Sequence, residues 1–301
     1  MKLNQIKALI AIAETGSIRA AARKIGLTQP ALSKNLQALE EELSVRLVHR
    51  TARGVNLTTY GQAILARGRG IAIEFERLRE EIEHMRGAQN GTLSIAVSPS
   101  PAMLLLPPAM RRFRQAFPSI QVCVRDGVYP NTLQLLREGL VDMSVGAHPP
   151  LAKSTLAEFQ VETLYENKLV VTCRKGHPRA NAKSLTELLD CEWLIHGPTE
   201  GPGSLHTPAF RANGIPLPSP LVVSESFISS LSLLENSDAL CLLPARLIEH
   251  LSLAGRLMAL KLKEPMPDWD VSLITRVQSP LTPVAQKMVE IFRRTRPMNF
   301  A

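Results

Sequence analysis

Residues 17–40, SIRAAARKIGLTQPALSKNLQALE, decide the N-terminal fold, because they predict two short helices joined by a tight turn. Ser17 and Thr28 are the kind of side chain that caps a helix N-terminus, and Gly26 supplies the left-handed conformation that ends the first helix. Apolar residues at three- and four-residue spacings give each helix one buried face. The stretch therefore predicts a helix-turn-helix.

The second of these helices has a polar face that the core does not use. Its leucines recur at spacings of four, three and four and face inward: Leu32, Leu36, Leu39 and Leu43. On the outer face, Gln matches adenine, Lys matches guanine or phosphate, and Ser serves either role. We expect the residues that open this helix and reach DNA to be Gln29, Pro30, Ser33, Lys34 and Gln37.

Positive charge is concentrated at the same end of the chain. Residues 1–57 hold nine Lys or Arg against four Glu, a net charge of +5, so only +3 of the formal +8 belongs to the other 244 of the 301 residues. Such a field suits a nucleic-acid polyanion. Residues 47–58, LVHRTARGVNLT, predict a hairpin turning at Arg53-Gly54, a wing whose Arg50 and Arg53 contact the DNA backbone. The alternative is a helical bundle whose polar face is only solvated.

Residues 59–86 predict one long helix of about 42 Å with an apolar seam. The seam follows steps of four and three residues, as in a coiled coil. We expect dimerisation through its central residues, Ile71, Phe75, Leu78 and Ile82. The alternative is a helix that lies along its own domain. Two recognition helices held by a dimer would read an inverted repeat in double-stranded DNA.

Beyond Asn90-Gly91 the charge thins, and short apolar strands alternate with amphipathic helices. This order predicts an α/β domain of two lobes, with its ligand at the carboxyl ends of the strands. The fold class is therefore a multidomain chain with α+β and α/β parts. The expected domains are a winged helix-turn-helix at 1–58, a linker helix at 59–87 and an effector-binding domain at 92–301. Lobe I takes about 92–161 and 267–301, and lobe II about 162–266.

The ligand site is expected where the two lobes face each other. Ser98, Ser100 and Pro101 follow the first strand and open a helix, so hydroxyls and helix N–H groups converge there on a small organic anion. His196 leaves a strand of the second lobe in the corresponding place and is expected to donate to the ligand, while Gly146 and Phe227 form the wall. The alternative for Ser100 is a helix cap only, and for Phe227 a core position.

The stretch AETGSIRAAARKIGLTQPALSKNLQALEEEL, followed by R-x-x-x-G-V-x-L-T and Gly61, resembles the LysR-type transcriptional regulators. The resemblance implies that Gln29, Pro30, Ser33 and Lys34 open the recognition helix and that Arg50 and Arg53 belong to the wing. It also implies a linker-helix homodimer that often pairs into a homotetramer on an interrupted inverted repeat, RNA polymerase as a further partner, and a C-terminal domain similar to type 2 periplasmic binding proteins. The sequence departs from the family in having Ser44 where Gly is usual.

Several function classes are disfavoured by what the sequence lacks. No nucleophile elbow, zinc-protease motif or nucleotide-binding loop is present, so we expect no catalytic residues, no metal and no cofactor apart from a small-molecule effector. The rival hypothesis is a solute-binding or enzymatic domain fused to a DNA-binding head. Without a signal peptide or a membrane-length apolar run, a cytoplasmic location with no membrane partner is expected. We expect four buried thiols, with a redox pair as the alternative: Cys123, Cys173, Cys191 and Cys241.

Overall fold

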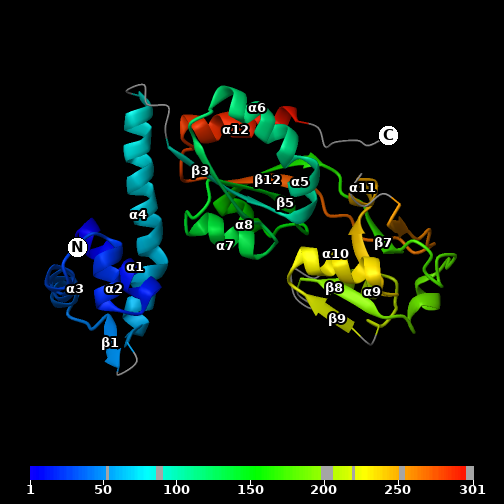
Figure 1. Cartoon of the computed structure of the whole chain (residues 1–301), viewed down its shortest axis with the longest axis horizontal. Helices are drawn as coiled ribbons and strands as arrows, with labels where there is room; N and C mark the ends of the chain where they lie inside the picture. The colour runs from blue at the N-terminus through cyan, green and yellow to red at the C-terminus, as the bar shows by residue number, and fades with distance from the viewer. Residues whose placement is uncertain (52–53, 86–90, 198–205, 219–220, 251–254, 296–301) are drawn as a thin grey trace. The chain divides into compact units, whose positions relative to one another are not determined.

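The computed structural model describes residues 1–51, 54–85, 91–197, 206–218, 221–250 and 255–295 (Figure 1). The chain divides into two compact units, Met1–Ala88 with Arg137–Leu140, and Gln89–Leu136 with Val141–Ala301. Each unit has its own apolar core. Among the described residues, no helix is both long enough and apolar enough to cross a bilayer.

The first unit is a winged helix-turn-helix followed by a long helix. Its elements are α1 (Leu3–Thr15), α2 (Ile18–Lys24), α3 (Gln29–Leu43), β1 (Val48–Thr51), β2 (Gly54–Leu57) and α4 (Thr59–Met85). The predicted caps Ser17 and Thr28 accept hydrogen bonds from the backbone N–H three residues on, at 3.4 and 3.3 Å, and Thr58 caps α4 in the same way at 3.0 Å. The local capping chemistry therefore sets where each helix begins.

Helix α3 ends in an unusual way. Ser44 follows it in the left-handed conformation, with φ 55°, and is the one residue other than glycine with positive φ among those described. Leu43, which the spacing placed in the core, is instead 37% exposed. The left-handed turn ends the helix and redirects the chain towards β1, so the leucine pattern stops being buried one turn early.

We predict that Ser44→Gly stabilises the first unit by about 1 kcal/mol, because glycine avoids most of the steric cost of the left-handed conformation. Denaturant unfolding of the full chain, followed by a probe of the first unit, measures the change. An unchanged or lower midpoint would show that the Ser44 side chain contributes more than its backbone conformation costs.

The second unit begins with a five-stranded sheet in the order β4-β3-β5-β12-β6. Helices α6 and α12 cover one face, and α7 covers the other (Figure 1). The elements are β3 (Thr92–Val97), α5 (Pro99–Leu104), α6 (Leu106–Ala116), β4 (Gln121–Asp126), α7 (Asn131–Arg137), β5 (Met143–Ala147), α8 (Lys153–Glu158), β6 (Phe159–Tyr165), β12 (Val271–Arg276) and α12 (Pro283–Arg294). β4 and β5 run parallel to β3, whereas β12 is antiparallel to β5 and β6.

A second lobe lies between β6 and β12 in the chain. Its strands β10-β7-β11 form an antiparallel sheet, and the parallel pair β8-β9 joins it through Leu194 N–H donating to Leu240 O at 2.8 Å. The elements are β7 (Leu169–Arg174), η1 (Leu185–Leu188), β8 (Trp193–His196), α9 (His206–Ala212), β9 (Leu221–Ser224), α10 (Phe227–Asn236), β10 (Cys241–Pro244), α11 (Ala245–Ile248) and β11 (Leu257–Ala259).

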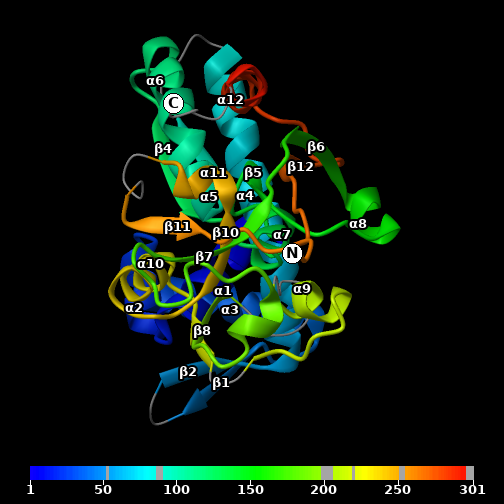
Figure 2. The same ribbon diagram turned by 90° about the vertical axis from the view of Figure 1, so that its right-hand side faces the viewer.

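The two lobes differ from the predicted layout in detail. Strand β6 continues to Tyr165 beside β12, so the first sheet extends past the expected boundary at 161 (Figure 2). Residues 99–116 form two helices, α5 and α6, because Pro107 and Pro108 remove the N–H donors that would continue the first one. The chain crosses between the lobes twice, at 166–168 and 260–270, and these crossings meet at an antiparallel bridge between Lys168 and Asp268.

Candidate nucleic-acid interface and ligand pocket

Helix α3 presents a continuous polar face. Gln29, Pro30, Lys34 and Gln37 are exposed and Ser33 is half-buried, as the helical spacing predicted. Gln37 Nε2 donates to Glu41 Oε1 at 2.8 Å, which orients the glutamine along the helix. Arg50 lies on β1, where only its backbone is described, and Arg53 lies outside the described residues. The face has the amide, hydroxyl and ammonium groups that read base edges.

A buried carboxylate fastens the wing to this helix. Glu40 is only 7% exposed, and its Oε1 accepts hydrogen bonds from the backbone N–H of Leu47 at 2.7 Å and of Val48 at 3.3 Å. Its Oε2 accepts from Arg46 at 2.9 Å. A charged acceptor on backbone donors makes a strong hydrogen bond. Sequence reasoning missed this role. The signal was that Glu40 stands four residues after Leu36, on the face of the helix that the leucines bury.

The other strand of the wing is held by the turn between α1 and α2. Val55 N–H donates to Gly16 O at 2.9 Å, and a Cβ on Gly54 would stand 2.6 Å from the same oxygen. Gly54 also has φ 134°, so glycine is required there for both space and conformation. Both strands of the wing are thus tied to the helix-turn-helix.

We predict that Glu40→Leu weakens binding to specific and non-specific DNA alike by about tenfold, because two buried N–H groups lose their acceptor and release the wing. Glu40→Gln keeps an acceptor oxygen and should recover most of the affinity. Gln37→Ala, on the exposed face of the same helix, should instead relax sequence preference.

The measurement is competition between a site selected by the wild type from a random DNA pool and its shuffled version, at a temperature where every variant is folded. Wild-type affinity in Glu40→Leu would show that the wing holds its place without the carboxylate.

The apolar seam of α4 divides into two parts. Ile64 packs against the helix-turn-helix core, and a Cβ on Gly68 would stand 2.8 Å from Ile6 Cγ2, so the first part covers its own domain. The later seam residues are exposed, as follows: Ile71 49%, Phe75 45%, Leu78 53% and Ile82 48%. The first turns of α4 therefore lie along the helix-turn-helix core, as the alternative expected. Further along, Arg77 Nη2 donates to Gly139 O at 3.3 Å, on a face of α4 other than the exposed seam.

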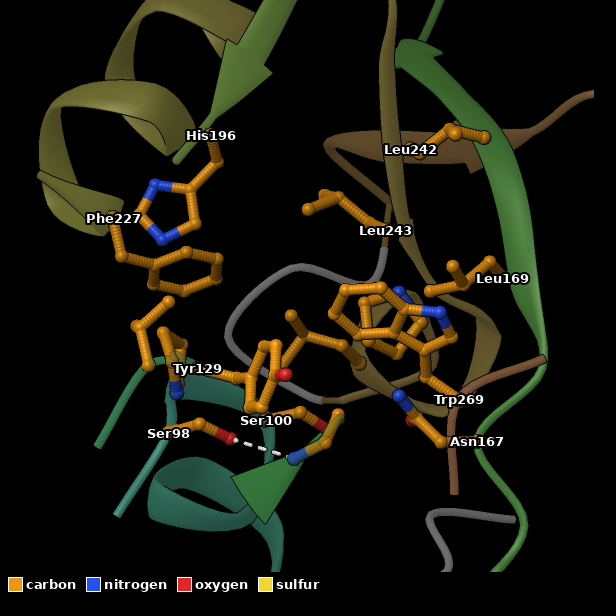
Figure 3. Close-up of a pocket in the computed structure, with 15 residues that line it drawn as sticks. Ser98, Ser100, Tyr129, Asn167, Leu169, His196, Phe227, Leu242, Leu243 and Trp269 are labelled. Atoms are coloured by element: carbon orange, nitrogen blue, oxygen red, sulfur yellow. Dashed lines mark hydrogen bonds between the residues drawn. The ribbon is translucent and has the colours of Figure 1, made fainter. Parts of the chain in front are cut away.

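A pocket of about 80 Å³ lies between the lobes of the second unit (Figure 3). Ser98 and Ser100 line one side, Asn167 and Trp269 come from the two crossings, and His196 comes from the end of β8. Most of the remaining wall is apolar and includes Leu169, Phe227, Leu242, Leu243, Pro244 and Leu247. At roughly 10–15 Å³ for each water-sized volume, the cavity suits a molecule the size of a single ring with its substituents.

Two aromatic pairs frame the pocket. The ring of Tyr129 meets Trp269 edge to face at 6.3 Å, and the ring of His196 meets Phe227 in the same manner at 5.4 Å. These pairs lie at different ends of the cavity in Figure 3. Edge-to-face packing fixes ring orientation, so the walls are shaped before a ligand arrives. Asn167, Tyr129 and Trp269 were not predicted, because long-range chain crossings bring them here and no local pattern marks them.

Polar atoms in this pocket are left without hydrogen-bond partners. Among the described residues, the buried atoms that lack one include Ser100 Oγ, Asn167 Oδ1 and His196 Nε2, all from residues that line the pocket. Ser100 is 5% exposed and Asn167 is 1% exposed. Such unpaired atoms cost free energy unless a ligand or water satisfies them.

The start of α5 provides fewer amides than the sequence led us to expect. The helix has six residues, of which Pro99 and Pro101 have no N–H, and Ala102 N–H donates to Ser98 O at 3.0 Å. Only Ser100 can offer a backbone donor from this turn. Ser98 Oγ accepts from Ala147 N–H at 3.4 Å, which leaves the serine proton to be donated (Figure 3).

The protonation of His196 follows from its neighbours. Burial lowers the pKa of His196, although the Asp126 carboxylate opposes the shift, so the imidazole is neutral at pH 7. Ser230 Oγ donates to Ser226 O at 3.0 Å and lies 3.4 Å from His196 Nδ1, while His196 Nε2 has no hydrogen-bond partner among the described residues. A neutral imidazole donates at one nitrogen and accepts at the other, so the donor role expected for His196 stays a prediction.

Two residues of the predicted site do not line the pocket. Pro101 is buried, but it is not among the lining residues. Gly146 lies behind the wall, where an added Cβ would be 3.2 Å from Ser98 Cβ and 3.1 Å from Gly127 O. Gly146 therefore gives Ser98 its place, and Ala147 is the residue of β5 that lines the cavity.

The cysteines are free thiols, and only Cys173 and Cys241 are buried as expected, whereas Cys123 and Cys191 are half-buried. Burial raises the pKa of Cys173 to about 11 and of Cys241 to about 12, and it also raises the pKa of Cys191. Protonated thiols are poor nucleophiles, so these features do not favour redox chemistry. In the described part of the chain, no group of three His, Cys, Asp or Glu side chains is placed to hold a metal ion.

Residues 3–62 match the family described as bacterial regulatory helix-turn-helix proteins of the lysR family, and residues 86–297 match the LysR substrate binding domain. The chain belongs to the LysR family. It is a DNA-binding transcriptional regulator with an effector-binding domain, and the family consists of regulators, not enzymes. These matches coincide with the helix-turn-helix unit and with the unit that holds the pocket.

LysR-family relatives are similar over much of their length. A probable nitrogen assimilation transcriptional activator of Synechococcus elongatus is 33% identical over 198 residues, covering 66% of this chain and 62% of that relative. An SDS degradation transcriptional activation protein of a Pseudomonas species is 28% identical over 292 residues, covering 95% and 94%. The crystal structure of CbnR, a LysR family transcriptional regulator, has the same fold, with TM-score 0.68, 24% identity and coverage of 98% and 99%.

Proposed function

We propose that this LysR regulator reads an inverted repeat through α3 and the wing, as a homodimer, and changes its grip on DNA when a small organic anion binds between the lobes. The exposed amide and ammonium face of α3, from Gln29 to Gln37, supports base reading. The attached wing supports positioning on the backbone. A homotetramer on an interrupted repeat and a contact with RNA polymerase stay predictions.

Dimerisation is carried by the exposed later seam of α4. Its four large apolar side chains lie at spacings of four, three and four, and each is 45–53% exposed in the single chain. Exposed apolar residues at coiled-coil spacing are stabilised by pairing with a second helix. A second copy of α4 supplies a matching seam, which favours self-association.

We predict that Leu78→Glu yields a smaller species in sedimentation and loses specific DNA binding, because two symmetry-related carboxylates would be buried at a cost of several kcal/mol. Ala66→Glu, an exposed position of α4 outside the seam, is the matched control and should keep the wild-type mass. An unchanged mass for Leu78→Glu would place the dimer contact elsewhere.

The effector proposal is carried by one observation: a cavity with apolar walls that contains buried polar atoms without partners. Pockets of this composition bind small organic molecules, with the few polar groups setting orientation. The serine hydroxyls at Ser98 and Ser100 suit a carboxylate or sulfonate, and the aromatic walls suit a ring. An aromatic carboxylate or sulfonate is therefore our candidate class. Binding would favour one lobe arrangement, and so one arrangement of the dimer on DNA, by differential affinity.

We predict that Ser100→Val lowers the affinity for such an acid by about 1–3 kcal/mol and leaves DNA affinity without effector unchanged, because a donor is lost while the volume is kept. Titration calorimetry with acids found by thermal shift measures the ligand affinity. A DNA-binding assay without effector measures the DNA affinity. Ser232→Val, an exposed serine on α10, is the control. Wild-type ligand affinity in Ser100→Val would remove this serine from the site.

A further inference from the structure

The pocket between the lobes contains both hydrogen-bond donors and buried polar atoms without partners. Ser98 Oγ already accepts from Ala147 N–H, so its own proton is available to donate to a ligand. Ser100 Oγ, two residues further on in α5, is buried near the Tyr165 hydroxyl and makes no hydrogen bond of good geometry. Both hydroxyls are therefore available to donate to an acid or carbonyl oxygen.

Two other lining residues have buried polar atoms without partners. Asn167 Oδ1, from the first crossing, has no donor, and His196 Nε2, at the end of β8, has no partner, while its Nδ1 lies 3.4 Å from Ser230 Oγ. Figure 3 shows these two side chains away from each other, on either side of the space that Tyr129 and Leu243 enter. A ligand with acceptor groups alone would satisfy the serines and leave Asn167 Oδ1 unpaired.

An unpaired buried acceptor discriminates strongly between ligands. A site built to hydrogen-bond a hydroxyl rejects the analogue that lacks it, because the protein atoms are then desolvated with nothing in exchange. Asn167 is 1% exposed, so water from the bulk does not reach it once the cavity is filled. The group that meets it must belong to the ligand.

We propose that the effector is bifunctional: an acid group bound by Ser98 and Ser100, and a hydroxyl that donates to Asn167 or His196, joined by a flat apolar body of one ring. This inference rests on the proposed effector function and names its ligand class, a hydroxy-substituted aromatic acid. A hydroxyl both donates and accepts, so it serves either orientation of the Asn167 amide.

The size and walls of the cavity agree with this class. Its volume of about 80 Å³ corresponds to roughly five to eight water-sized volumes, the scale of one substituted ring. Tyr129 and Trp269 at one end and Phe227 at the other offer ring faces and edges to that body. In the described part of the lining there is no Lys or Arg, so neutral hydrogen bonds carry the selectivity.

The test is a ligand series on the full-length wild type, which needs no variant to fold. Benzoate is compared with 2-, 3- and 4-hydroxybenzoate by titration calorimetry. We expect at least one hydroxybenzoate to bind about tenfold more tightly than benzoate, the effect of one well-made hydrogen bond in a buried site. Benzenesulfonate serves as a second parent acid.

Variants then assign the hydroxyl. Asn167→Leu and His196→Phe are titrated with benzoate and with the preferred hydroxybenzoate, and one of them should erase the tenfold preference while benzoate binding stays within about threefold. Asn236→Leu, an exposed asparagine at the end of α10, should keep the preference.

The outcomes separate the two proposals. Equal binding of benzoate and all three hydroxybenzoates, or a preference that survives in both variants, overturns the bifunctional effector and leaves the proposed anion sensor standing. Failure of every acid and of benzenesulfonate to bind overturns the aromatic anion effector and this inference with it.

Discussion

The cost of burying an unpaired polar atom organises both halves of this protein. In the DNA-binding unit that cost is met within the chain, because the Glu40 carboxylate accepts from two backbone N–H groups and an arginine. In the effector unit it is left unmet at Ser100, Asn167 and His196. The first arrangement makes a rigid reader of DNA, and the second makes a cavity whose stability depends on what occupies it.

Local chemistry made the DNA-binding unit predictable from the sequence. The hydroxyls of Ser17, Thr28 and Thr58 act on backbone groups three residues away, so their roles follow from short patterns. Glu40 escaped because its partners lie beyond a left-handed turn at Ser44, a conformation that sequence propensity does not assign to serine. The sequence showed that Ser44 replaces the glycine usual in the family, but it did not show that this serine adopts the left-handed conformation.

A pocket lies between the lobes where the sequence predicted one, but only part of its lining was predicted. Ser98 and Ser100 follow a strand directly, and strand ends mark ligand sites in α/β sheets. Asn167 and Trp269 enter from two crossings separated by about a hundred residues of the chain, and only the tertiary fold brings them together. Pro101 was chosen for its neighbourhood in sequence, yet it is buried in α5 and does not line the pocket. Phe227, which had two possible roles, lines the cavity beside His196.

The apolar face of helix α4 has two parts. Its first turns pack on α1 at Gly68, and its later turns carry the exposed seam from Ile71 onward. Because each residue advances an α-helix by about 100°, the rotation of the DNA-reading head about the helix axis is set by the residue count between these two stretches. In the proposed dimer α4 therefore fixes the angle of each DNA-reading head relative to the dimer contact. A single inserted residue between Gly68 and Ile71 would turn each recognition helix away from the groove while leaving every domain intact.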